Sequence, residues 1–304
     1  MIWRIYRVAF LATLLTLSLA VPAQAQQQDF SQVVIGTETV ADGLYMLTGS
    51  GGNIGVLTGP DGVILIDDQY ADLVGKIRVA VAAISPQEIR LVLNTHWHFD
   101  HTGGNELLGR GGALIIAHEN VRKRMSSEQF TEFFQKTTPA SPGIALPVVT
   151  FTRDVTLHLN GQTIEVQYVP PAHTDGDSIV WFKELNAVHL GDTYFNGFYP
   201  FIDFSTGGSM RGMIGAANMA LARMDDETKV IPGHGPLSNR SQLRDFRDML
   251  RTVSDRIEAD IRAGKSLEEV VAGKPTAKFD AEWGDGFIQP DDWVRLLYKG
   301  MSAP

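Results

Sequence analysis

The order of apolar and polar positions along the chain predicts alternating strands and helices. Short, nearly continuous aliphatic runs are typical of buried strands, and apolar positions three or four apart are typical of helices. The predicted strands are Val40–Leu47, Ile54–Leu57, Gly62–Asp67, Arg90–Asn94, Ala113–Ala117, Val155–Leu159, Thr163–Tyr168, Ser178–Trp181, Ala187–Leu190 and Lys229–Ile231. The predicted helices are Ala71–Ile84, Glu119–Lys136, Met210–Met224 and Ser241–Ala263.

These elements form two successive sets of strands, each followed by helices. Two such sets imply two sheets that pack together with helices on the outside, which is an α/β fold. The pair Asn160-Gly161 is a strong hairpin-turn signal between two of the strands. No obvious linker divides residues 26–304, and a chain of this length can bury a large core. We therefore expect one domain over residues 26–304.

The first 25 residues predict export. Arg4 and Arg7 precede an apolar run, Val8–Val21, and Ala23-Gln24-Ala25 matches the small-x-small pattern of a signal-peptidase site. A single membrane-spanning helix is the alternative, since the run with its flanks approaches the shortest length that spans a bilayer. Because Pro22 and a glutamine-rich stretch follow instead of charges, we predict a signal peptide at residues 1–25, cleaved after Ala25. The mature protein is then periplasmic or secreted, without a stable membrane anchor.

Composition narrows the chemistry. The chain has no cysteine, which excludes thiolate metal ligands and a cysteine nucleophile. Its formal charge is −9, and about −11 once a leader with two arginines and no acids is removed. Such an acidic protein is a poor partner for nucleic acid or an anionic membrane. We expect a small-molecule substrate, and the sequence leaves the oligomeric state open.

The densest chemical signal is the hexapeptide His96-Trp97-His98-Phe99-Asp100-His101, which follows the predicted strand Arg90–Asn94. In extended backbone, His96 and His98 project to the same side because they lie two residues apart. A turn after them lets Asp100 and His101 point to a neighbouring place. Three imidazoles and a carboxylate this close together are typical of a metal site.

Three more candidate ligands follow other predicted strands. They are His173 in Pro170-Pro171-Ala172-His173, Asp192 in Gly191-Asp192-Thr193 and His234 in Pro232-Gly233-His234-Gly235. Each occupies a strand-to-loop junction beside glycine or proline. Such junctions gather at one edge of a sheet, where α/β sites are commonly built.

The hexapeptide and these later residues resemble the metallo-β-lactamase superfamily, from the glycine-rich turn near residue 50 to His234. The resemblance implies an αββα four-layer sandwich with two zinc ions at one edge of the sheets. It implies one zinc on His96, His98 and His173, a second on Asp100, His101 and His234, and Asp192 between the two. Asp67 matches the aspartate that braces the hexapeptide loop, although a turn-forming aspartate is an equal alternative.

The ligand set implies a mechanism. Imidazole and carboxylate ligands without thiolate suit zinc, with iron or manganese as alternatives. A water between two zinc ions can have its pKa lowered to ~7, so that hydroxide attacks a carbonyl carbon at neutral pH. Asp100 is expected to orient this nucleophile as well as to bind metal, which makes it the predicted catalytic residue. No serine nucleophile is required.

The segment after Asp192 is unusually aromatic and is the candidate substrate wall. Phe195 and Phe198 would form an apolar surface, and Asn196 would hydrogen-bond a carbonyl; ordinary packing is the alternative. We expect Trp97 and Phe99 to pack beneath the metals. The role of the Gly49–Asn53 turn as a flap over the cleft stays open. The remaining histidines are expected to be structural or surface residues: His118, His158 and His189.

The substrate is the least defined feature. Export and likeness to the lactamase branch favour hydrolysis of a β-lactam, which would imply antibiotic resistance. An aspartate at position 192 is instead the habit of lactonases, thioesterases and other ester hydrolases of the superfamily, so these remain the alternative. The missing basic tract disfavours a nuclease. The missing flavin module, together with the intact histidine ligands, disfavours a di-iron electron carrier. A non-catalytic zinc-binding protein is the alternative of another class.

Overall fold

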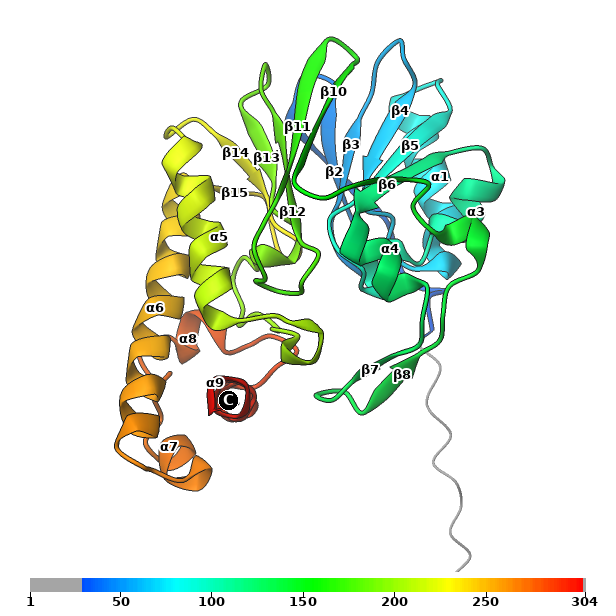
Figure 1. Cartoon of the computed structure of the whole chain (residues 1–304). Helices are drawn as coiled ribbons and strands as arrows, with labels where there is room; N and C mark the ends of the chain where they lie inside the picture. Colours follow the sequence, from blue (N-terminus) through cyan, green and yellow to red (C-terminus); the bar gives the residue numbers. More distant parts are fainter. Residues whose placement is uncertain (1–28, 303–304) are drawn as a thin grey trace, which may run out of the picture.

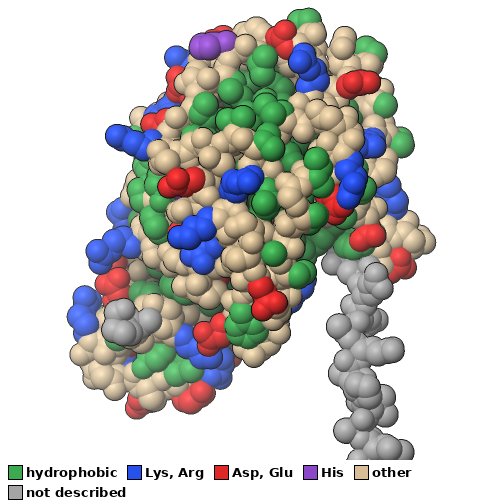
Figure 2. Space-filling model, turned by 45° about the vertical axis from the view of Figure 1, so that its right-hand side comes forward, with side chains coloured by type: hydrophobic (Ala, Val, Ile, Leu, Met, Phe, Trp, Pro, Cys, Tyr) green, Lys and Arg blue, Asp and Glu red, His purple; other side chains and the backbone are tan. Residues whose placement is uncertain are grey.

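The structure is a computed structural model that describes residues 29–302 (Figure 1). The predicted signal peptide, residues 1–25, lies outside the described residues. Within residues 29–302, no helix is both long and apolar enough to cross a membrane. On the face shown in Figure 2, acidic and basic side chains are interspersed and do not form a continuous basic surface.

The first of the two large sheets has seven strands in the order β1-β2-β3-β4-β5-β6-β9. Neighbours from β1 to β4 are antiparallel, whereas β4, β5, β6 and β9 are parallel. The strands are β1 (Gly36–Ala41), β2 (Leu44–Thr48), β3 (Ile54–Leu57), β4 (Val63–Ile66), β5 (Ile89–Asn94), β6 (Leu114–His118) and β9 (Val149–Phe151). The runs β3 and β4 are buried along their whole length, as expected for a sheet covered on both faces.

The second large sheet has six strands in the order β10-β11-β12-β13-β14-β15. Its strands are β10 (Asp154–Leu159), β11 (Gln162–Tyr168), β12 (Ser178–Phe182), β13 (Ala187–His189), β14 (Lys229–Ile231) and β15 (Ser238–Asn239). Asn160 and Gly161 both have positive φ and close the β10–β11 hairpin, as their sequence predicts.

Helices cover the outer faces of both sheets (Figure 1). They are α1 (Val74–Ile84), α2 (Phe99–Thr102), α3 (Asn105–Arg110), α4 (Glu119–Met125), α5 (Met210–Arg223), α6 (Arg240–Arg262), α7 (Leu267–Ala272), α8 (Asp280–Trp283) and α9 (Pro290–Ser302). Short 3-10 turns lie at Ala71–Leu73, Gly143–Ala145, Gly191–Thr193 and Phe204–Thr206.

Three apolar clusters define four layers. One lies between the sheets and joins residues such as Ile66 of β4 and Val180 of β12. A second packs α1 and α3 on the first sheet, for example through Ile77. The third packs α5, α6 and α9 on the second sheet, for example through Phe246 and Trp293. The order helix, sheet, sheet, helix confirms the αββα sandwich that the sequence implied.

Two predicted elements are wrong in detail. Val40–Leu47 is the end of one strand and most of the next, because Asp42 and Gly43 turn the chain and Gly43 has a φ of 72°. The predicted helix Glu119–Lys136 ends at Met125. Its last turn is closed by the side chains of Ser126 and Gln129, which donate hydrogen bonds to the carbonyls of Lys123 and Arg124 (2.8 and 3.0 Å).

The rest of that segment is a two-stranded hairpin, β7 (Gln129–Thr131) and β8 (Lys136–Thr138). It forms a small sheet apart from the two large ones and projects beside their edge (Figure 1). We call it the β7–β8 hairpin. Its tip holds Phe133 and Phe134, whose rings pack against Phe201 at centroid distances of 5.6 and 4.9 Å.

Candidate metal centre

The seven predicted ligands come together at one edge of the two sheets. His96 and His98 follow β5, and Asp100 and His101 lie in the short helix α2. The other three follow strands of the second sheet: His173 after β11, Asp192 after β13 and His234 after β14. The fold thus converts strand-to-loop junctions that are distant in sequence into one cluster.

The first group of donor atoms comes from His96, His98, His173 and Asp192. His173 Nε2 lies 2.8 Å from His98 Nδ1 and 3.4 Å from Asp192 Oδ2. His96 Nε2 lies 3.7 Å from the same Asp192 oxygen. All four residues are buried.

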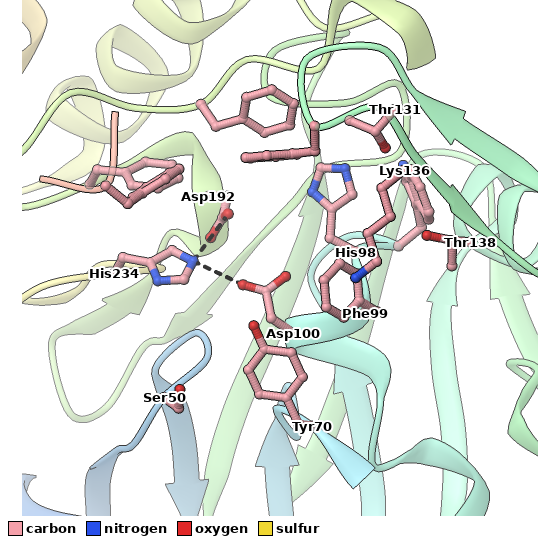
Figure 3. A pocket seen from close by; sticks show the side chains of 15 residues that line it. Ser50, Tyr70, His98, Phe99, Asp100, Thr131, Lys136, Thr138, Asp192 and His234 are labelled. Carbon is pink, nitrogen blue, oxygen red and sulfur yellow. Dashed lines mark ion pairs between the residues drawn. The ribbon is translucent and has the colours of Figure 1, made fainter. Parts of the chain in front are cut away.

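The second group comes from Asp100, His101 and His234. His101 Nε2 lies 3.3 Å from His234 Nε2, and Asp100 Oδ2 lies 3.6 and 3.4 Å from these two nitrogens. Asp192 joins this group as well, because its Oδ1 is 3.0 Å from His101 Nε2 and its Oδ2 is 3.4 Å from His234 Nε2. Figure 3 shows His234 between the carboxylates of Asp192 and Asp100.

These distances fit a metal site better than a hydrogen-bond network. Ligand atoms ~2.0–2.1 Å from a tetrahedral zinc are ~3.3 Å from one another, close to the spacings in both groups. The buried Nε2 of His96 has no hydrogen-bond partner, which is costly unless a cation binds it. Imidazole nitrogen and carboxylate oxygen are donors that zinc accepts. The clusters therefore fit a metal site.

The pKa values of the candidate ligands also support a metal site. Burial lowers the pKa of His96 well below its usual value and that of His173 to about 4, so both rings are held in the neutral form that binds metal. Burial also opposes protonation of His234, but the charges of Asp192 and Asp100 outweigh it and raise its pKa to about 9. The buried carboxylates thus require nearby positive charge, which a metal ion would supply.

Asp67 braces the hexapeptide loop. It follows β4 with a φ of 65°, and it is fully buried. Its Oδ2 lies 2.8 Å from His101 Nδ1, and both of its oxygens accept hydrogen bonds from Thr95 at 2.7 Å. The Thr95 hydroxyl in turn lies 3.1 Å from His96 Nδ1. One carboxylate therefore orients the loop and the imidazole of His101.

Sequence reasoning missed Asp203, which does the same for His98. Its Oδ2 lies 3.0 Å from His98 Nε2 and accepts a hydrogen bond from Thr206 at 2.7 Å. Burial raises the pKa of Asp203, but its contact with His98 outweighs burial and holds the pKa below its usual range. The available signal was a single acid within the apolar run 201–204. Nearby, the carbonyl of Phe201 lies 2.9 Å from His173 Nδ1.

A cavity of about 400 Å³ opens onto the candidate ligands (Figure 3). This volume is within the range of small-molecule sites. Much of its wall is aromatic, and polar side chains complete it. The lining residues are Ser50, Tyr70, Trp97, His98, Phe99, Asp100, Thr131, Phe134, Lys136, Thr138, Asp192, Phe195, Phe201, His234 and Phe287. Of the predicted substrate contacts, Phe195 lines the cavity and stacks on His234 at a centroid distance of 5.0 Å.

The other two predicted contacts, Asn196 and Phe198, lie outside the residues that line the cavity. Asn196 is buried outside the cavity lining, where its amide donates to the Pro236 carbonyl (2.9 Å) and accepts from the Tyr194 hydroxyl (3.0 Å). Phe198 also lies outside the lining and packs behind Phe195.

The expectation for the aromatic residues between the ligands also changes. Trp97 is buried as predicted, yet it lines the cavity. Phe99 is partly exposed and lines the cavity too, so it is not simply packed beneath the ligands.

The Gly49–Asn53 turn is docked on the ligand loops. The Gly52 amide donates to the Asp100 carbonyl at 3.1 Å, and a Cβ on Gly52 would overlap the His101 ring. The side-chain amide of Asn53 donates to the carbonyls of Pro232 and Gly235 at 3.0 and 2.8 Å. The turn therefore packs against the loops that carry the ligands and supports them.

The remaining histidines lie outside the donor groups. His189 is buried, with its Nε2 3.1 Å from the Asn53 carbonyl. His118 stacks on Tyr168 at a centroid distance of 4.1 Å. His158 is exposed on β10. These positions agree with the structural or surface roles expected for them.

Comparison with known sequences identifies relatives. Residues 47–234 match the metallo-beta-lactamase superfamily. The hydroxyacylglutathione hydrolase of Polaromonas sp. is 29% identical over 164 residues, which are 53% of this chain and 54% of that protein. The chain thus spans about half the length of this relative. The hydroxyacylglutathione hydrolase of Haemophilus influenzae is 25% identical over 167 residues, which are 55% of this chain and 78% of that protein.

Solved structures share the fold. A metallo-beta-lactamase from Pontibacter korlensis superimposes with a TM-score of 0.57 at 19% identity, covering 71% of this chain and 99% of that one. The inverting sec-alkylsulfatase Pisa1 from Pseudomonas sp. gives a TM-score of 0.66 at 17% identity, covering 87% of this chain and 50% of that one. Since the superfamily match extends over more than half of the sequence and includes all seven candidate ligands, this chain belongs to the metallo-beta-lactamase superfamily and is a metal-dependent hydrolase.

Proposed function

We propose that the chain is a two-zinc hydrolase that cleaves the acyl bond of a small thioester or ester. The observation that carries this proposal is the position of Asp192. Its two oxygens lie within 3.0–3.7 Å of His96, His173, His101 and His234, so one carboxylate contacts both donor groups. His96, His98 and His173 would hold one ion, and Asp100, His101 and His234 the other.

Two such ions, when bound, supply an activated water and a Lewis acid for a carbonyl oxygen. The protein's own contribution is orientation. Asp67 and Asp203 fix the rings of His101 and His98, which keeps the donor atoms pointing at the site. Asp100 reaches the cavity with a partly exposed carboxylate, so it can accept a hydrogen bond from the attacking water. The aromatic walls give the bond that breaks largely apolar surroundings.

Thioester or ester cleavage ranks first for two reasons. First, an aspartate at this position is the habit of lactonases, thioesterases and other ester hydrolases of the superfamily, and Asp192 contacts both donor groups. Second, the curated relatives named above are hydroxyacylglutathione hydrolases. Hydrolysis of a β-lactam is the second candidate. It is favoured by the largely apolar cavity beside the ligands, which would accept a rigid bicyclic amide as well as an acyl chain.

The test compares three substrates on the zinc-loaded protein: an aryl thioester, an acyl lactone and a chromogenic cephalosporin. We expect the thioester or the lactone to be turned over fastest and the His98→Ala variant to lose metal and all activity. Because the chain has no cysteine, a thiol reagent reports the released thiol without reacting with the enzyme. Faster cleavage of the cephalosporin would move the substrate to β-lactams. No turnover of any of the three would overturn the proposal.

We also propose that the protein acts after export, as its N-terminal sequence predicts. A cleavable leader would direct the enzyme to substrates outside the cytoplasm. Fractionation of cells that express the full chain, followed by mass spectrometry of the purified N-terminus, tests this. A mature protein that begins at Gln26 supports the proposal, and an uncleaved protein in the cytoplasm contradicts it.

A further inference from the structure

The β7–β8 hairpin brings one positively charged side chain to the cavity. Lys136, on β8, is the only lysine or arginine among the lining residues that the structure describes. Its ammonium lies over the Phe99 ring, with Nζ 3.6 Å from the ring centroid. Figure 3 shows the side chain extending over Phe99, on the side of the cavity where Asp100 and His98 lie.

Lys136 differs from several other lysines of this acidic chain, which form ion pairs. Lys183, Lys265 and Lys274 form ion pairs with carboxylates 2.6–3.3 Å away. Within residues 29–302, no carboxylate lies within 4 Å of Lys136 Nζ. An ammonium held on an aromatic face keeps the donors that point away from the ring available to a ligand.

The surroundings of Lys136 divide the cavity into two parts. The hydroxyl residues Thr131 and Thr138 lie beside it on the same hairpin and also line the cavity. The aromatic residues Phe195 and Phe287 lie near His234, on the other side of the candidate ligands. A ligand that fills the cavity therefore meets a cationic, hydroxyl-bearing end and an apolar end.

We propose that Lys136 recognises a carboxylate on the substrate, placed away from the bond that is cleaved. This inference rests on the proposed function and names the substrate class: acyl thioesters or esters with one apolar group and one carboxylate. A single ammonium with neighbouring hydroxyl groups matches a singly charged anion. No arginine among the described residues lines this cavity to add the paired donors that strengthen the binding of a phosphate dianion.

The test uses two substrates that differ only in charge. S-phenylacetyl-4-mercaptobenzoate carries the carboxylate, and S-phenylacetyl-4-mercaptobenzamide replaces it by a neutral amide of similar size. We expect Lys136→Met to lower kcat/KM for the benzoate by about five- to twentyfold, mainly through KM. The same variant should leave kcat/KM for the benzamide within about twofold, because the metals and their ligands are unchanged.

Two further variants separate charge from structure. Lys136→Arg keeps the positive charge and should retain most of the preference for the benzoate. Lys123→Met removes an exposed lysine of α4 outside the cavity lining and should change neither substrate. An equal loss on both substrates in Lys136→Met, or no loss on the benzoate, would overturn the inference.

A binding experiment keeps this inference distinguishable from the proposed function. Calorimetry measures the affinity of the zinc-loaded protein for biphenyl-4-carboxylate and for biphenyl-4-carboxamide, neither of which is hydrolysed. We expect Lys136→Met to weaken the carboxylate by at least about fivefold and to leave the amide unchanged. If no thioester is cleaved but this difference appears, the proposed reaction fails and the anion site stands. If thioesters are cleaved and the difference is absent, the reaction stands and the anion site fails.

Discussion

The edge that carries the candidate ligands and the β7–β8 hairpin opposite it are built in contrasting ways. Five of the seven ligand side chains are buried, whereas those of Asp100 and His234 are 20% and 19% exposed. A neighbouring group contacts the second nitrogen of most of the imidazole rings. The hairpin pairs only with itself and exposes Phe130 and Phe134, which are 52% and 47% accessible. If the two proposals hold, catalysis takes place where the two large sheets fix the side chains, and substrate recognition takes place on a hairpin where substitutions disturb the fold little.

The largest expected effect comes from the residue that joins the two donor groups. Asp192→Ala removes the oxygens that approach four histidines, and we expect hydrolysis to fall at least about a thousandfold. Bound metal, measured by plasma mass spectrometry, should fall with it. Asp226→Ala, at an exposed carboxylate, is the matched control. Wild-type activity in Asp192→Ala would contradict the account.

A smaller loss is expected from a residue that acts through a ligand. Asp203→Asn keeps the size of the side chain but weakens its contact with His98, and should lower metal affinity or activity by about 10–100-fold. A zinc titration separates a loss of metal affinity from a loss of catalytic activity. Activity should largely recover at high zinc concentration if only the orientation of His98 is lost. Unchanged zinc affinity together with unchanged activity would show that His98 needs no brace.

Substitutions in the β7–β8 hairpin should change substrate affinity and leave metal binding intact. Phe134→Ala removes a cavity wall that packs on Phe201, and should raise KM for an apolar acyl group by roughly two- to tenfold, a loss typical of hydrophobic contacts. Metal content and kcat should stay near wild type. A loss of metal in this variant would erase the distinction between the two regions.

The smallest effect concerns a histidine outside both regions. Burial lowers the pKa of His118, so the unfolded chain binds its proton first as the pH falls. The stability that neutral His118 contributes is therefore present above about pH 6.5 and is lost as the pH falls towards the folded pKa. His118→Gln should lose less stability than wild type between pH 7 and pH 5, by a Tm difference of about 1 °C. Activity should not change.

Exposed His158→Gln serves as the control for that measurement. An activity loss in His118→Gln larger than its effect on folding would instead assign His118 a role at the site.

The same contrast explains how much the sequence could predict. The candidate ligands could be predicted because each follows a short aliphatic strand, and strand ends gather at one edge of a sheet. The role of Asp203 could not be predicted, because it depends on a contact with His98, 105 residues away in sequence. The hairpin was missed because helical spacing continues past Ser126, where side-chain hydrogen bonds end α4. Local pattern gives elements and junctions, and only tertiary contact shows which junctions meet.

The central claim is that the clustered side chains hold two metal ions that act together. The most direct test removes metal with a chelator and then titrates zinc while bound zinc and thioester hydrolysis are followed on the same sample. The account predicts that hydrolysis rises until two zinc ions are bound per chain, and that Asp192→Ala does not reach this level. Full hydrolysis by the metal-free protein, or full hydrolysis with one ion bound, would contradict it.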